Sequence, residues 1–189
     1  MTENRNDSRT LALLIGGAAA GILGSRLLPP LLAVFNGARR AEHGHDPFEL
    51  LISDHRGILA LLDEMEAAPA DSTLGRSRMF LMFKRKLGKH AMAEEDVVYP
   101  LLHSTGQDAQ GSKELYDEHA DMKILLFRLE ELLMAGEDWR EPVRSLRDLI
   151  RDHIQEEEQV VFPRLRQLLG ENRAPKVSGQ IRREEALVL

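Results

Sequence analysis

The sequence predicts an all-α fold, an antiparallel up-down-up-down four-helix bundle that follows an N-terminal hydrophobic helix. Three observations lead to this prediction. Apolar residues recur every three or four positions over four long segments, which is the spacing of helix faces that pack together. The alternation typical of β-strands is missing. Short runs rich in Gly, Pro and Asp separate the four segments, so consecutive helices are expected to pack side by side.

The N-terminal part has three sections. Residues 1–10 are polar, residues 11–35 are hydrophobic, and residues 36–46 have the composition of a linker. Residues 11–28 approach the length of about 20 residues that a membrane-spanning helix needs. Gly17 and Gly21 lie four apart, a spacing that lets membrane helices approach closely. We therefore expect residues 11–28 to anchor the protein in a membrane; a signal peptide and a helix lying on the surface are the alternatives.

Arginines suggest the orientation of this anchor. More of them follow the hydrophobic segment than precede it, which favours a cytoplasmic position for the domain behind it. If the segment does not anchor the chain, the expected location is still the cytoplasm.

Four bundle helices are expected within residues 47–170. Their starts are marked by capping residues or an N-terminal Pro, and their ends by Gly or Pro. The expected starts are Asp46–Pro47, Thr73, Ser112 and Asp138–Pro142, and the expected ends are Pro69, Gly106, Gly136 and Gly170. Residues 171–189 are mostly polar, and we expect a mobile tail there, or a tail with a short docked helix.

One stretch of the second helix recurs in the fourth helix. Seven of the fourteen residues from Lys89 to Leu102 are identical to the residues 63 positions later. Each copy contains a His and a Glu four residues apart, which one helix face presents together. Each copy also contains a Pro six residues after the Glu, where we expect the helix to bend. The first and third helices each add one His, so the bundle is predicted to consist of a two-helix unit used twice.

Six polar residues of this repeat occupy positions where a bundle helix usually has leucine. They are His55, His90, Glu94, His119, His153 and Glu157. Burying an unpaired polar group costs about 1–3 kcal/mol, and six of them would offset much of a domain stability of about 5–15 kcal/mol. A shared cation removes this cost. The alternative is a buried histidine whose hydrogen bonds are made within the protein. It suits one such residue, but not six residues repeated in register.

Composition limits the metal and the partners. The chain has no cysteine, which excludes disulfides and thiolate metal sites. Four imidazoles and two carboxylates suit iron or manganese, with zinc possible. Glu94 and Glu157 come from opposite helices and are placed to bridge two ions, with open positions for water, oxygen or peroxide. The net charge of −6 gives no reason to expect a nucleic-acid partner.

The order His, His-x-x-x-Glu, His, His-x-x-x-Glu, with Glu-Glu and Val-Val-aromatic-Pro in both copies, resembles the hemerythrin-like HHE cation-binding family. The resemblance covers residues 47–169. It implies a four-helix bundle with a non-haem di-iron centre held by the six residues given above. Members of this type are associated with iron or oxygen sensing, oxidative and nitrosative stress, and sometimes peroxide breakdown.

The sequence departs from the oxygen-carrying members at two positions. They have a second His one turn after the third-helix His, where this chain has Lys123, and a final Asp where it has Glu157. The resemblance therefore favours binding or sensing of iron, dioxygen, reactive oxygen species or NO over oxygen storage. The alternatives are a di-iron enzyme that breaks down peroxide and a metal-free interaction bundle.

Four further residues lie close to the predicted ligands in the sequence. Tyr116 lies one turn before His119, and either packs at the bundle edge or faces the site. Lys123 is expected to reach solvent. Glu95 and Glu158 follow the ligand carboxylates and are expected to point to solvent rather than to bind metal.

Overall fold

The computed structural model describes residues 46–69, 72–104 and 109–187. The predictions for the polar N-terminus, the hydrophobic segment and most of the linker concern residues 1–45, which lie outside the described residues. Within the three described ranges, none of the helices has the length and apolar character needed to span a membrane.

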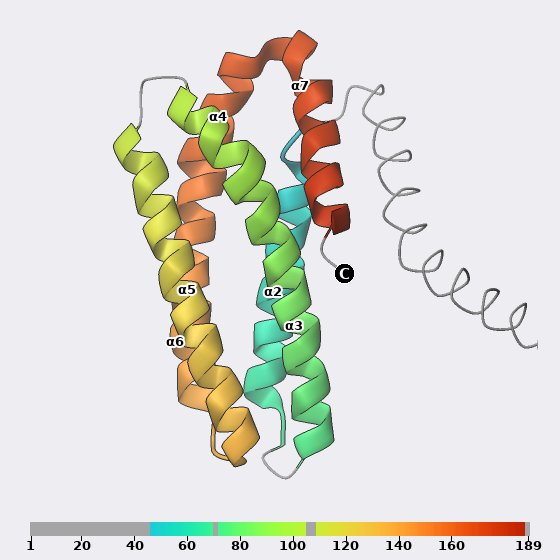
Figure 1. Ribbon diagram of the computed structural model, residues 1–189, viewed down its shortest axis with the longest axis vertical. Helices are drawn as coiled ribbons and strands as arrows, with labels where there is room; N and C mark the ends of the chain where they lie inside the picture. Colours follow the sequence, from blue (N-terminus) through green and yellow to red (C-terminus); the bar gives the residue numbers. More distant parts are fainter. Residues whose placement is uncertain (1–45, 70–71, 105–108, 188–189) are drawn as a thin grey trace, which may run out of the picture.

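The described chain is all-α, and four of its helices pack as a bundle (Figure 1). These four are α2 (Glu49–Ala67), α3 (Thr73–Ala93), α5 (Ala109–Ala135) and α6 (Arg140–Glu156). Helix α2 packs against α3 and α6, and α5 packs against the same two helices. Helix α3 continues through a π-helical turn, η2 (Glu94–Val98), into α4 (Tyr99–Ser104), and α6 continues through η3 (Glu157–Val161) into α7 (Phe162–Leu187). The predicted bundle is confirmed.

The boundaries predicted at Asp46–Pro47, Thr73 and Gly136 agree with the structure, whereas Gly106 lies outside the described residues and α7 continues beyond a kink at Gly170. Asp46 precedes α2, and its Oδ1 accepts a hydrogen bond from the Phe48 amide at 3.1 Å, which satisfies one of the amides at the helix start. Gly136 ends α5 with a φ of 72°, and Gly170 interrupts α7 with a φ of 59°. Both values are in the left-handed region, which Gly adopts at no steric cost.

The two prolines of the repeat follow the two π-helical turns. The carbonyl of Glu94 accepts the Tyr99 amide, and the carbonyl of Glu157 accepts the Phe162 amide, five residues on in each case. In such a turn the Glu95 carbonyl would pair with residue 100, but Pro100 has no N–H. The Tyr116 hydroxyl donates to this carbonyl instead, at 2.7 Å. The disturbance expected from Pro thus takes the form of a widened turn that begins at each predicted ligand Glu.

Two apolar clusters fill the interior, one toward each end of the bundle. One is built from residues near the α4 and α7 end, including Phe48, Tyr99 and Phe162. The other lies toward the opposite end and includes Phe83 and Trp139. His55 and His119 fall between residues of the two clusters along α2 and α5, and in the other two bundle helices the polar positions lie where one cluster gives way to the other. The six polar side chains therefore form a layer between two apolar layers.

The C-terminal segment forms a docked helix, the second of the two expected alternatives, rather than a mobile tail. After Gly170, residues 171–187 continue as the second part of α7 and run back alongside α3 and α4 (Figure 1). Val177, Ser178 and Ile181 are buried, and the two apolar side chains join the cluster at that end of the bundle. The segment docks because Val177 and Ile181 are four apart and share one helix face, which the many charged neighbours obscure in the sequence.

Candidate metal centre

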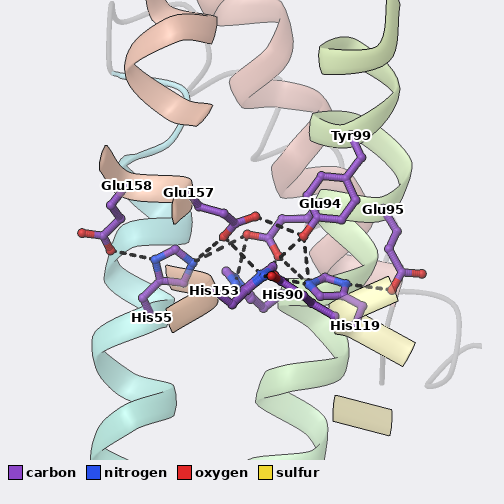
Figure 2. A network of polar contacts seen from close by, with 10 residues as sticks. His55, His90, Glu94, Glu95, Tyr99, His119, His153, Glu157 and Glu158 are labelled. Carbon is purple, nitrogen blue, oxygen red and sulfur yellow. Dashed lines mark hydrogen bonds and ion pairs between the residues drawn. The ribbon is translucent and has the colours of Figure 1, made fainter. Parts of the chain in front are cut away.

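The six predicted residues converge on one point inside the bundle (Figure 2). Helices α2, α3, α5 and α6 each supply one imidazole, and the first residue of each π-helical turn supplies one carboxylate. Each of the six residues is at most 3% exposed. The structure brings together all of the residues that the sequence singled out: His55, His90, Glu94, His119, His153 and Glu157.

The six residues form two groups in which ligand atoms lie close enough to share an ion. His55, His90, Glu94 and Glu157 form the first group, and Glu94, His119 and His153 form the second. Glu94 belongs to both: its Oε1 lies 3.0 Å from His90 Nε2, and its Oε2 lies 3.5 Å from His119 Nε2. Glu157 Oε2 also reaches both groups, at 3.2 Å from His55 Nε2 and 3.5 Å from His153 Nε2.

Three of the four imidazoles are held by a carboxylate on the nitrogen that faces away from the centre. The three contacts are His55 Nδ1 to Glu158 Oε1 at 2.7 Å, His119 Nδ1 to Glu95 Oε1 at 2.9 Å, and His153 Nδ1 to Glu118 Oε2 at 2.6 Å. Glu95 and Glu158 lie outside the two ligand groups, as expected, but each also holds a ligand imidazole, a role that the sequence did not predict. Such contacts fix the orientation of a ligating ring and place its proton on the outer nitrogen.

His90 is the exception, because its Nδ1 is buried and has no hydrogen-bond partner among the described residues. Asp54 lies in the position equivalent to Glu118 in the repeat. Its carboxylate instead pairs with Lys86, and it lies beside Glu185 of α7. The C-terminal part of α7 thus contacts Asp54, close to the first ligand group. At this position the two halves of the repeat differ, because Glu118 contacts a ligand imidazole and Asp54 pairs with Lys86 instead.

Burial, the charge of Asp54 and a hydrogen bond with it raise the pKa of Glu185 to about 8. A carboxyl group whose pKa is raised in the folded state stabilises the fold at low pH, and this contribution is lost as the pH rises through that value. At about 1.36 kcal/mol per pKa unit, we expect the metal-free protein to lose on the order of 4 kcal/mol of stability from this group between about pH 5 and pH 9.

The variant Glu185→Gln tests this expectation. Urea denaturation at several pH values should give a flatter pH dependence for the variant than for the wild type. The exposed Glu64 serves as the matched control, and Glu64→Gln should retain the wild-type slope. Equal slopes in all three proteins would show that Glu185 is not coupled to folding.

Tyr99 is a residue of the centre that the sequence reasoning missed. It is fully buried, and its hydroxyl donates to Glu157 Oε1 at 3.0 Å while lying 2.9 Å from His119 Nε2. The signal was present in the repeat, where Tyr99 is matched by Phe162 between two identical residues. Phe162 stacks on the His55 ring at 5.9 Å.

Tyr116 and Lys123 support the centre without entering it. Tyr116 is 40% exposed, and besides its bond to the Glu95 carbonyl its ring packs edge-on against Tyr99. Lys123 reaches the surface as expected, and its ammonium contacts Glu95 Oε1 at 2.6 Å. The hydrogen bond from His119 and, against the effect of burial, the Lys123 ammonium lower the pKa of Glu95 to about 2.

Without a cation, the centre compensates its two buried carboxylates with protons. Burial opposes a charge on His55, but hydrogen bonds and charges of Glu157 and Glu94 raise its pKa to about 10. Burial likewise opposes a charge on His153, and the Glu157 charge and the Glu118 hydrogen bond raise its pKa. Against burial, the charge of His90 and a hydrogen bond from His55 hold the pKa of Glu94 well below its usual value. Metal binding must therefore displace protons.

Protons do not satisfy all of the polar atoms that face the centre. His55 Nε2, Glu94 Oε1, Glu94 Oε2 and Glu157 Oε2 are buried, and although they lie within ion-pair distance of neighbouring ligand atoms, none of them forms a well-aligned hydrogen bond among the described residues. Buried polar atoms are rarely left unpaired in proteins, so each such atom needs an explanation. Once a metal ion displaces the extra proton of His55, all four are lone-pair donors of the kind that hard and intermediate metal ions prefer. The residues present therefore fit one or two bound cations.

These features define a helical bundle with a buried His/Glu site suited to metal ions. Residues 46–165 match the hemerythrin HHE cation-binding domain, and the chain belongs to that family. The chain is also 29% identical over 146 residues to a protein named "DNA nickase" from Nostoc sp. (strain PCC 7120 / SAG 25.82 / UTEX 2576). The match covers 74% of this chain and 41% of that relative. No solved structure gives a significant match.

Proposed function

We propose that this HHE domain holds two iron ions and uses them to bind or sense dioxygen, reactive oxygen species or NO. The observation that carries the proposal is the set of buried ligand atoms on His55, Glu94 and Glu157, which face one another without well-aligned hydrogen bonds. An interior of this kind is stable when a cation takes up those lone pairs. Two ligand groups that share Glu94 favour two ions over one.

The residues divide between the two proposed ions as the distances suggest. His55, His90, Glu94 and Glu157 would hold one ion, and Glu94, His119 and His153 would hold the other. When bound, the ions supply Lewis acidity and one-electron redox chemistry. The protein supplies fixed imidazole orientations through Glu158, Glu95 and Glu118.

The donor set supports iron over softer metals. Nitrogen and oxygen ligands alone suit iron and manganese, and zinc binds such ligands too. A chain without cysteine has no thiolate with which to select a softer metal. We therefore propose iron in the cell, with manganese or zinc as the ions most able to replace it.

Burial supports a small ligand. The six ligand residues are at most 3% exposed, so a molecule of a few atoms suits the centre better than an extended substrate. Lys123, in place of the additional His of the oxygen carriers, is 61% exposed and pairs with Glu95. The centre thus lacks a nitrogen donor at that position, which favours sensing over oxygen storage.

The second candidate function is an enzyme that breaks down peroxide, which Tyr99 favours because a buried hydroxyl lies at the centre. Catalysis requires that the iron-loaded protein consumes peroxide faster than the same concentration of free iron. The third candidate is a bundle that binds a partner without metal, and it requires a melting temperature that chelators leave unchanged.

The name of the Nostoc relative is not carried over to this chain. The chain spans about two-fifths of that protein, and a net charge of −6 offers no electrostatic attraction to DNA. We propose that nucleic acid is not a partner. We also propose that residues 11–28 attach the domain to a membrane, from the length and apolar composition of that segment.

Reconstitution with iron tests the proposed function. Purified protein is loaded with iron(II) without oxygen, desalted, and then exposed to air or NO. We expect two iron ions per chain and an absorption spectrum that changes with air and reverts with reductant. Less than one iron, manganese or zinc ion per chain would contradict the proposal. The double variant His90→Ala/His153→Ala is the control that should bind none.

A further inference from the structure

We infer that the Tyr99 oxygen is a protein ligand of the second ion, the one placed among Glu94, His119 and His153. This inference rests on the proposed function, because it requires that metal binds. It adds a ligand of a different chemical type to the six residues of the repeat. It also makes the two metal positions chemically different.

The two ligand groups differ in their number of protein donors. The first group contains four protein ligands, whereas the second contains three. The Tyr99 oxygen lies 2.9 Å from His119 Nε2, 3.4 Å from His153 Nε2 and 3.0 Å from Glu157 Oε1. Neighbouring ligand atoms in an octahedral shell with bonds of about 2.1 Å are about 3 Å apart. The phenol oxygen therefore has the spacing of a fourth donor in the second group.

The positions of the protons on His119, His153 and Tyr99 also indicate a cation site. Glu95 and Glu118 accept from the outer nitrogens of His119 and His153, so the proton of each neutral ring is on Nδ1. Once metal binding has displaced the extra proton of His153, both rings are neutral, and the two Nε2 atoms present lone pairs to each other, 3.2 Å apart. The single proton of Tyr99 is directed to Glu157, so its oxygen also turns a lone pair to both rings. Three lone pairs that converge within hydrogen-bond distance form a cation site.

The two halves of the repeat differ at the position of Tyr99. Phe162 is equivalent to Tyr99 and packs on His55 and on Phe48 at ring distances of 5.9 and 4.7 Å. A phenyl ring is therefore compatible with this place in the fold. The hydroxyl of Tyr99 is held within the centre, and Tyr116 packs edge-on against its ring at 5.0 Å.

Ligation is an acid–base step. In the metal-free protein the Tyr99 hydroxyl donates to Glu157 Oε1 and therefore carries its proton. When the ion binds, the phenol O–H bond breaks, the oxygen bonds to the ion, and the proton passes to the buffer. No electron is transferred. The neighbouring carboxylates disfavour an ionised phenol, whereas a cation in the site favours it. Tyr99 therefore loses its proton when the metal binds and not before.

Iron(III) and the two tyrosines of the chain provide the test. A phenolate bound to iron(III) gives an intense visible charge-transfer band and tyrosinate vibrations in the resonance Raman spectrum excited within that band. Full-length wild type, Tyr99→Phe and Tyr116→Phe are loaded with iron(II) and oxidised with ferricyanide. We expect the band and the vibrations in wild type and Tyr116→Phe and their loss in Tyr99→Phe, with the iron content unchanged.

A second probe avoids iron redox chemistry. Binding of gallium(III) should produce the near-ultraviolet difference spectrum of one ionised phenol in wild type and none in Tyr99→Phe. Circular dichroism confirms that each variant is folded. Two bound ions without a phenolate signal in wild type, or a signal that survives in Tyr99→Phe, would overturn the inference and leave the proposed function standing. A chain that binds no ion would overturn both.

Discussion

Removal of the metal with a chelator is expected to lower the melting temperature by roughly 10 °C or more. An ion present at 100 times its dissociation constant stabilises the folded state by about 2.7 kcal/mol, and two ions contribute about twice that. For a domain of this size, each kcal/mol corresponds to about 2–4 °C. The metal-free bundle should remain folded, because protons on His55 and His153 partly compensate the buried carboxylates.

Calorimetry of the iron-loaded protein with and without chelator measures this shift. The double variant His90→Ala/His153→Ala should show no shift on chelation. His103 is exposed and lies outside the centre, so His103→Ala is the matched control and should retain the full shift. A wild-type melting temperature that chelation leaves unchanged would favour a bundle that does not use metal.

Replacement of Glu94 by Gln is expected to lower the iron content from two ions per chain to fewer than one. Glu94 is fully buried, and its two oxygens face different groups: Oε1 faces His55 and His90, and Oε2 faces His119. An amide keeps the shape but loses the negative charge and one acceptor. Loss of a group that only orients a ligand costs about 10–100-fold in affinity, so loss of a shared ligand should cost more than about 100-fold.

A graded series of Glu→Gln variants makes this prediction specific. Of the six ligand residues, the Glu95 carboxylate contacts only His119, at its outer nitrogen, and Glu95→Gln should weaken binding by roughly 10–100-fold. Glu64 is exposed on α2, and Glu64→Gln should bind two ions with wild-type affinity. Competition with a coloured chelator gives the three affinities. An affinity of Glu94→Gln equal to that of Glu64→Gln would exclude a metal-ligating role for Glu94.

Spacing alone predicted the bundle and the convergence of the six polar residues. Helical periodicity places residues four apart on one face, and the repeat brings the two halves into register around a common axis. A polar residue on an apolar face must lie in the interior, and there His55, His90 and Glu94 meet the other three. These predictions depend on local chain geometry, which the sequence determines.

The features that the sequence did not reveal depend on contacts between segments far apart in the chain. Glu158 contacts His55 across 103 residues, and Tyr99 meets Glu157 across 58. The π-helical turns depend on where the Glu95 carbonyl finds a donor once Pro100 supplies none. The sequence allowed a docked helix in residues 171–187, but its position depends on the apolar groups at the end of the bundle that receive Val177 and Ile181.

A crystal structure of the iron-loaded protein, with anomalous differences measured at the iron absorption edge, tests the central claim most directly. The claim predicts two anomalous peaks inside the bundle, one among His55, His90, Glu94 and Glu157 and one among Glu94, His119 and His153. A map without a peak there, from crystals in which these side chains face one another without metal or turn to solvent, would contradict it.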